Sequence, residues 1–300
     1  EDNTVMHWYP QGIAGSATAS ADGTWNGRKV ALVTWYHKPE EDSSTDQNKG
    51  ARVAIVDYTD MNDIRYRMAL LVEPYWNEGQ ADLKPIKIHA GGLGWVGNYL
   101  YIADTSKGFR VFDMQRILQV QTGDPDALGF GSEETGYQAF DYRYGIPRVS
   151  AYRLTDESCC ARFSFASIDL STQPPRLLSG EYSADSIAGR LHAWPFDVNT
   201  GRLMEIDGVV VSSWASFPGV SKMQWALTRD DHVFVSSSYD MGIFYEAPIG
   251  DTLKSHPWSY FPEDLHFSAF SGNLWCLTEM PGYRFVFAVQ TADILSNCDE

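Results

Sequence analysis

The stretch HAGGLGWVGNYLYIAD at residues 89–104, followed closely by GFRVFD at residues 108–113, decides the fold class. It contains three short runs rich in Val, Ile, Tyr, Phe and Trp, and glycine-rich turns separate the runs. Short alternating runs bounded by such turns are typical of half-buried β-strands. The stretch therefore predicts three antiparallel strands joined by tight turns.

The same pattern returns along the chain. It recurs at residues 223–246 and 265–287, and two less regular units occupy residues 12–72 and 162–214. A recurring unit of a few strands that cannot bury both of its faces alone is the signature of a propeller blade. We therefore expect an all-β fold, a five-bladed β-propeller that forms a single domain over residues 1–300. A six-bladed ring is the alternative, with a degenerate blade within residues 123–153.

The last unit lacks an outer strand before the chain ends, and residues 5–9 (VMHWY) form a strand candidate that no unit uses. Pairing the two would close the ring and remove exposed strand edges. We therefore expect the N-terminal strand to close the propeller. Helical pattern is weak and is confined to residues 114–121 and 291–296.

The composition excludes several classes of partner. The net charge of −16 disfavours nucleic acid and anionic membrane surfaces. No run of eighteen apolar residues is present, so no transmembrane helix is expected. The carboxylates could give calcium affinity, but no metal-binding motif appears, so the cofactor is left open and no metal ligand is predicted. The expected partner is a carbohydrate or another small molecule, bound by a monomer.

Four cysteines and the start of the chain indicate the compartment. The chain starts at Glu1 without Met, as a processed, exported protein would. An even number of cysteines also favours an extracellular protein. Cys276 lies in a predicted strand of the last unit and Cys298 lies in the tail, so we expect a disulfide between them. The adjacent Cys159 and Cys160 form a vicinal bridge or stay reduced.

Propeller geometry gathers residues that are distant in sequence. The start of the first strand of each blade and the end of its second strand lie on one face, where they surround the mouth of the central channel. From these positions we predict catalytic roles for His89, Glu263 and Asp264. The predicted substrate-binding residues are Asp104, Arg162, Lys222, Gln224 and Glu279.

Each of these residues also has a structural interpretation. Asp104 precedes Thr and Ser and could cap a turn. His89 could be a hydrogen-bonded structural histidine. Glu263 and Asp264 are adjacent, and because neighbouring side chains alternate in direction along a strand, only one of them can face the channel.

Several of these stretches resemble a group of secreted, largely uncharacterised propeller-like proteins of actinobacteria and filamentous fungi. The resemblance rests on HAGG at 89–92, YIADT at 101–105, RVFD at 110–113, MQ at 223–224 and PEDL at 262–265. It covers about residues 27–292 and implies no particular activity. A five-bladed ring with carboxylates at its mouth also resembles the propeller glycosidases. Those enzymes carry an acidic residue early on the first inner strand, whereas residues 12–19 here contain none.

Three classes of function fit the sequence. The first is a secreted carbohydrate-active enzyme that cleaves a glycosidic bond at one funnel site. A hydrolase would use two carboxylates, and a lyase would use His89 or a Tyr as base with Arg162 or Lys222 neutralising a uronate. The second is a non-catalytic propeller that binds a glycan or small ligand, and the third is an interaction scaffold. The unequal units favour one asymmetric site over a repeated lectin motif.

Overall fold

The computed structural model describes residues 2–39, 47–155, 161–229, 231–239 and 241–296. It confirms the all-β fold class, because strands dominate and helices are short. The helices are two 3₁₀ turns, η1 (Ser16–Thr18) and η2 (Met114–Arg116), and the helix α1 (Thr291–Ser296). The last two fall in the two segments for which the sequence predicted helix.

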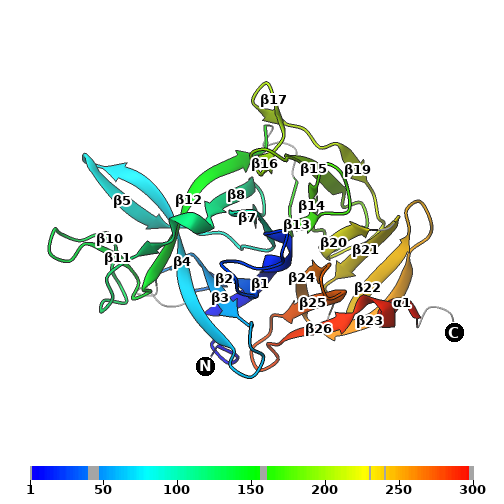
Figure 1. Ribbon diagram of the computed structural model, residues 1–300, viewed down its shortest axis with the longest axis horizontal. Helices are drawn as coiled ribbons and strands as arrows, with labels where there is room; N and C mark the ends of the chain where they lie inside the picture. Colours follow the sequence, from blue (N-terminus) through cyan, green and yellow to red (C-terminus); the bar gives the residue numbers. More distant parts are fainter. Residues whose placement is uncertain (1, 40–46, 156–160, 230, 240, 297–300) are drawn as a thin grey trace.

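The strands form five groups around a common centre (Figure 1). The first group contains β1 (Trp8–Gly15), β2 (Val30–His37), β3 (Ala51–Asp57), β4 (Arg65–Asn77) and β5 (Gln80–Pro85). The second contains β6 (Leu93–Val96), β7 (Tyr99–Asp104), β8 (Gly108–Asp113), β9 (Leu118–Gln119) and β12 (Tyr144–Arg153). Between β9 and β12 the chain forms the separate hairpin of β10 (Leu128–Phe130) and β11 (Tyr137–Ala139), which packs against β5.

The remaining three groups follow in chain order (Figure 1). The third contains β13 (Ser167–Asp169), β14 (Arg176–Gly180), β15 (Leu191–Asp197), β16 (Arg202–Leu203) and β19 (Trp214–Ser216), with the small hairpin β17 (Glu205–Ile206) and β18 (Val209–Val210) between them. The fourth contains β20 (Met223–Arg229), β21 (His232–Ser237), β22 (Met241–Pro248) and β23 (Lys254–Tyr260). The fifth contains β24 (Pro262–Ser268), β25 (Asn273–Thr278) and β26 (Val286–Gln290).

The first strands of the five groups surround the centre and touch one another in a closed circuit. Strand β1 contacts β6 and β24, β13 contacts β6 and β20, and β20 contacts β24. Within each group the pairing is antiparallel, as the sequence predicted. The core lies between neighbouring groups, where large side chains such as Trp95, Phe165 and Trp225 are fully buried.

The first two groups are fused, which the sequence pattern did not indicate. Strand β12 pairs with β8 through its second half and, in parallel, with β4 through residues 145–147. Together the two groups form one ten-stranded sheet. Eight strands follow the order β1-β2-β3-β4-β12-β8-β7-β6, while β5 pairs with β4 and β9 pairs with β12 beside this path. The long region of residues 123–153 is therefore used to join two groups and to build the outer β10–β11 hairpin.

The expected closure by the N-terminal strand is wrong. Trp8 and Tyr9 belong to β1, where they pair with His37 and Tyr36 of β2. In the described part of the chain the last group has only the three strands β24, β25 and β26. The N-terminal segment reaches this group through loop contacts instead, because Asn3 accepts hydrogen bonds from the backbone amides of Gly282 and Arg284.

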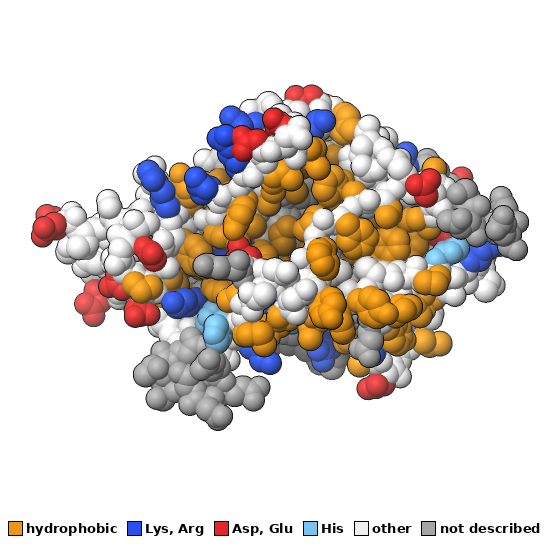
Figure 2. All heavy atoms as spheres, turned by 90° about the horizontal axis from the view of Figure 1, so that it is seen from below, with side chains coloured by type: hydrophobic (Ala, Val, Ile, Leu, Met, Phe, Trp, Pro, Cys, Tyr) orange, Lys and Arg blue, Asp and Glu red, His pale blue; other side chains and the backbone are white. Residues whose placement is uncertain are grey.

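One face of the molecule carries many exposed hydrophobic side chains. Figure 2 shows many of them on the face seen from below. Strand β26 forms the outer edge of the last sheet, and its first residue Val286 is exposed, as are Tyr283 and Phe285 just before it. The three-stranded sheet therefore leaves an apolar outer edge.

Glycine allows two groups to approach closely at the centre. A Cβ atom on Gly92, just before β6, would lie 2.2 Å from the Cα of Phe165 and 2.4 Å from the amide nitrogen of Ala166. Both are backbone atoms, which cannot rotate away. The glycines after His89 therefore serve backbone packing and do not open space for a ligand.

Gly92→Ala is expected to lower the free energy of unfolding by about 2–3 kcal/mol, because it overpacks the contact between the second and third groups. Gly145→Ala in β12 is the matched control, because the nearest atom to its Cβ would be a Val72 methyl at 3.6 Å. Urea unfolding of both variants measures the difference. Equal stability of the two variants would contradict the close approach.

Candidate functional site

The candidate site lies where β1 and β24 begin and β2 and β25 end. Glu279, directly after β25, accepts a hydrogen bond from Gln11 Nε2 of β1 at 2.7 Å. Tyr36 of β2 lies beside the same carboxylate, and its interaction with Glu279 acts to lower the pKa of Glu279. The ring centroid of His89 lies 4.3 Å from that of Tyr36. Glu263, near the start of β24, completes the group, since the charge of Glu279 acts on its carboxyl.

Backbone irregularities mark the site. The ladder between β1 and β2 shifts register between Pro10 and Gly12, so Gln11 occupies a bulge. The ladder between β24 and β25 shifts between Pro262 and Leu265, a gap that holds Glu263 and Asp264. Bulges of this kind redirect side chains and are frequent beside active sites. Gln11 of β1 and the acids Glu263 and Asp264 of β24 thus depart from the regular alternation of side chains along a strand, at the same end of the ring.

The two glutamates have raised pKa values. Burial raises the pKa of Glu263 well above its ordinary value, and the charges of Glu279 and Asp264 raise it further. Burial also raises the pKa of Glu279, although Arg284 and the hydrogen bond from Gln11 act in the opposite direction. Within the described residues, Glu263 Oε2 is buried without a hydrogen-bond partner. An unsatisfied buried carboxyl oxygen is costly and calls for an explanation, of which a catalytic role is one.

His89 belongs to the same site, and its pKa is lowered, whereas those of the two glutamates are raised. Desolvation and the nearby charge of Arg162 lower its pKa. Although the ring packs against Tyr36, the residue keeps exposed surface, so a ligand can reach it. At neutral pH the imidazole is therefore uncharged and can accept a proton.

Asp264 occupies a structural position. Its Oδ2 accepts hydrogen bonds from the backbone amides of Ile13 at 3.0 Å and Leu93 at 3.1 Å. The side chain is 0% exposed. Asp264 thus ties β24 to β1 and β6 at the centre of the ring. Its Oδ1 is buried without a hydrogen-bond partner among the described residues, and the catalytic role predicted for Asp264 stays a prediction.

Asp104 is also held by interactions within the protein. Its Oδ2 lies 2.8 Å from Arg110 Nη2, and its backbone oxygen accepts from the amide of Lys107. The side chain is buried, so the structural interpretation of Asp104 fits better than the predicted role in substrate binding.

The remaining predicted residues lie at first-strand starts of other groups. Arg162 precedes β13 and is exposed, and its charge reaches His89. The ammonium of Lys222 lies 4.6 Å from the ring centroid of Tyr239. Gln224 is half-buried and occupies a register shift between Met223 and Trp225, which is equivalent to the shift at Gln11.

Two residues of the site were missed from the sequence. Gln11 is a polar residue in the apolar run WYPQGIAG, and this interruption was the signal that could have revealed it. Tyr36 is the penultimate residue of β2, the second strand of the first group, and Glu279 directly follows β25, the second strand of the last group. The strand-end rule used for the other groups would have found Tyr36.

The cysteine predictions find little support. Cys276 is a buried, free thiol whose pKa burial raises to about 12. The structure therefore gives no support to the Cys276–Cys298 bridge, and Cys298 itself lies outside the described residues. Cys159 and Cys160 lie outside them as well.

Two further searches of the described residues gave negative results. No group of three or more His, Cys, Asp or Glu side chains is placed to hold a metal ion in the described ranges. Within the same ranges, no helix is long and apolar enough to span a membrane.

Comparisons with known proteins gave matches only among solved structures. No family model matches the sequence, and no curated protein matches it. Among solved structures, hydrazine synthase of Kuenenia stuttgartiensis is similar with a TM-score of 0.42 and 11% identity, over 99% of this chain and 81% of that one. The computationally designed protein Ika4 is similar with a TM-score of 0.27 and 9% identity, over 66% and 89% of the two chains.

Proposed function

We propose that the five strand groups are the blades of a five-bladed propeller and that the Glu263–Glu279 site cleaves a glycosidic bond. The closed circuit of first-strand contacts supports the blade count. The single observation that carries the activity is the pair of neighbouring glutamates, both with raised pKa values, one of them with an unsatisfied carboxyl oxygen. Enzymes that cleave glycosidic bonds by hydrolysis use two carboxyl groups, one of them kept protonated as the acid.

The surroundings give the two carboxyl groups different roles. Glu263 is the more deeply buried of the two, and the charge of the adjacent Asp264 raises its pKa further. Glu263 therefore keeps its proton to higher pH and serves as the general acid. Glu279 is held by Gln11 and Tyr36, and Arg284 stabilises its charged form, so it serves as the base or nucleophile. Tyr36 and His89, whose rings are tilted by 33° to each other, offer an aromatic surface to a sugar ring.

A β-elimination reaction uses the same site differently. The uncharged His89 would remove the proton beside a uronate carboxylate, and Arg162 would neutralise that carboxylate. The proximity of Arg162 to His89 is the observation that favours this second candidate. A propeller that binds a glycan without cleaving it is the alternative, and the same aromatic surface would serve it. In each case we expect an extracellular monomer.

A panel of neutral and uronate-containing polysaccharides tests the proposal. A hydrolase releases reducing ends, a lyase additionally produces absorbing unsaturated uronates, and a binder changes neither signal while retaining measurable affinity. Glu205→Gln in the exposed strand β17 is the control variant, because it removes a carboxylate far from the site. Absence of both product signals across the panel would contradict an enzymatic role.

A further inference from the structure

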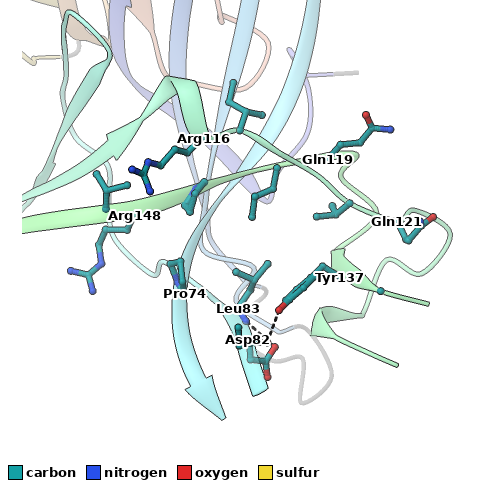
Figure 3. Close-up of a pocket in the computed structure, with 15 residues that line it drawn as sticks. Pro74, Asp82, Leu83, Arg116, Gln119, Gln121, Tyr137 and Arg148 are labelled. Atoms are coloured by element: carbon teal, nitrogen blue, oxygen red, sulfur yellow. Dashed lines mark hydrogen bonds between the residues drawn. The ribbon is translucent and has the colours of Figure 1, made fainter. Parts of the chain in front are cut away.

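A cavity of about 800 Å³ lies outside the ring, apart from the glutamate site. The β4–β5 hairpin, β9, β11 and β12 frame it (Figure 3). Its walls are mainly apolar and include Pro74, Leu83, Ile117, Leu118, Val120 and Val149. This volume and this lining are typical of pockets that bind small molecules of lipid or drug size.

The pocket is held open by hydrogen bonds at one end. Asp82 Oδ1 accepts from the backbone amides of Leu83 and Phe130, both at 2.8 Å, which fixes β10 to β5. The Tyr137 hydroxyl donates to the Ala81 carbonyl at 2.7 Å, which fixes β11 to the same strand (Figure 3). The β10–β11 hairpin therefore forms a wall of the pocket that hydrogen bonds hold in place. Asp82 Oδ1 already accepts two backbone hydrogen bonds.

The opposite end of the pocket is cationic. Arg116 and Arg148 lie there, away from Tyr137 and Gln121 (Figure 3). Glu73 Oε1 is shared between Arg148 at 3.1 Å and Lys84 at 3.3 Å.

Arg110 lies next to this end without lining the pocket, and it pairs mainly with Asp104. Arg116 pairs with Asp113 at 3.1 Å. Of these charged residues only Arg116 and Arg148 line the pocket. The four cations Lys84, Arg110, Arg116 and Arg148 exceed their three carboxylate partners Glu73, Asp104 and Asp113 by one positive charge, in a chain whose net charge is −16. In addition, Arg148 Nε is buried without a hydrogen-bond partner among the described residues.

From the apolar walls and the cationic end we propose that this pocket binds an amphipathic anion, a hydrocarbon chain with a carboxylate head. The chain would lie along the apolar walls, and the carboxylate would lie at the Arg116–Arg148 end. This inference does not depend on the Glu263–Glu279 site.

Titration calorimetry with dodecanoate and with the uncharged dodecanol tests the proposal. Dodecanoate is expected to bind at one site and more tightly than dodecanol. Arg116→Gln is expected to lower the affinity for dodecanoate about fivefold, because it removes one partly exposed cation, and to leave the affinity for dodecanol unchanged. Arg65→Gln is the matched control, since the Arg65 side chain is 74% exposed and pairs with Asp63, while that of Arg116 is 70% exposed.

A second variant tests the apolar wall. Leu118 is 37% exposed on β9, so Leu118→Asp should fold normally while placing a charge inside the pocket. This variant is expected to bind dodecanoate about tenfold more weakly or worse. Leu170→Asp, at a site that is 40% exposed and does not line this pocket, is the control. Absence of dodecanoate binding, equal affinity for dodecanol, or full affinity in Leu118→Asp would overturn the proposal.

Discussion

Glu279→Gln is expected to lower the turnover of the glycan identified in the screen by about 100- to 10,000-fold, the contribution of a positioned acid–base group. The amide still accepts the hydrogen bond from Gln11 and keeps the shape of the site, so kcat should fall while KM changes little. Initial rates over a range of substrate concentrations separate the two parameters. Glu205→Gln should retain the wild-type rate.

The same variant should also move the pH profile of the residual activity. The charge of Glu279 raises the pKa of Glu263, so removing that charge lowers the pKa of Glu263. The limb of the profile at which the acid loses its proton should therefore shift to lower pH. A Glu279→Gln enzyme with a rate within threefold of wild type and an unshifted profile would refute the assignment of the pair.

Asp264→Ala is expected to lower the free energy of unfolding by about 3–5 kcal/mol. The substitution leaves the buried amides of Ile13 and Leu93 without an acceptor, and each unpaired buried amide costs about 1–3 kcal/mol. It also leaves a cavity where three first strands meet. Asp264→Asn keeps an acceptor oxygen and should lose less. Urea unfolding at constant pH measures both values.

Asp63→Ala provides the comparison, because the side chain of Asp63 is exposed and its loss should change stability by less than about 0.5 kcal/mol. If Asp264→Ala were as stable as Asp63→Ala, Asp264 would not hold the first strands together, and a role in the site would have to be reconsidered.

Much of the fold followed from local pattern. The repeated strand-turn-strand units predicted the all-β class and most strand positions, because alternation and glycine turns are local properties. The fusion of β4 with β12 and the course of the N-terminal segment were not predicted. Both depend on which strand edges meet after the groups have packed, and no single stretch of sequence encodes that.

The site was predicted in part. Glu263, Glu279 and His89 were placed at one end of the ring by the strand-end rule, and the structure brings them together. Asp264 was assigned to the site as well, and in the structure it accepts hydrogen bonds from β1 and β6 at the centre of the ring. Sequence cannot tell which of two adjacent acids takes that position when a bulge disturbs the alternation. The side pocket left no motif, since its walls come from five segments spread over residues 74–149.

The most direct test of the glutamate pair is a carboxyl ¹³C NMR titration of the side chains of Glu263 and Glu279. Both carboxyls are expected to titrate above the ordinary glutamate value of about 4.3, with Glu263 the higher of the two. In Glu279→Gln the Glu263 resonance should titrate at lower pH than in the wild type. Ordinary pKa values for both residues, with Glu263 unaffected by the substitution, would contradict the central claim that the two form one acid–base pair.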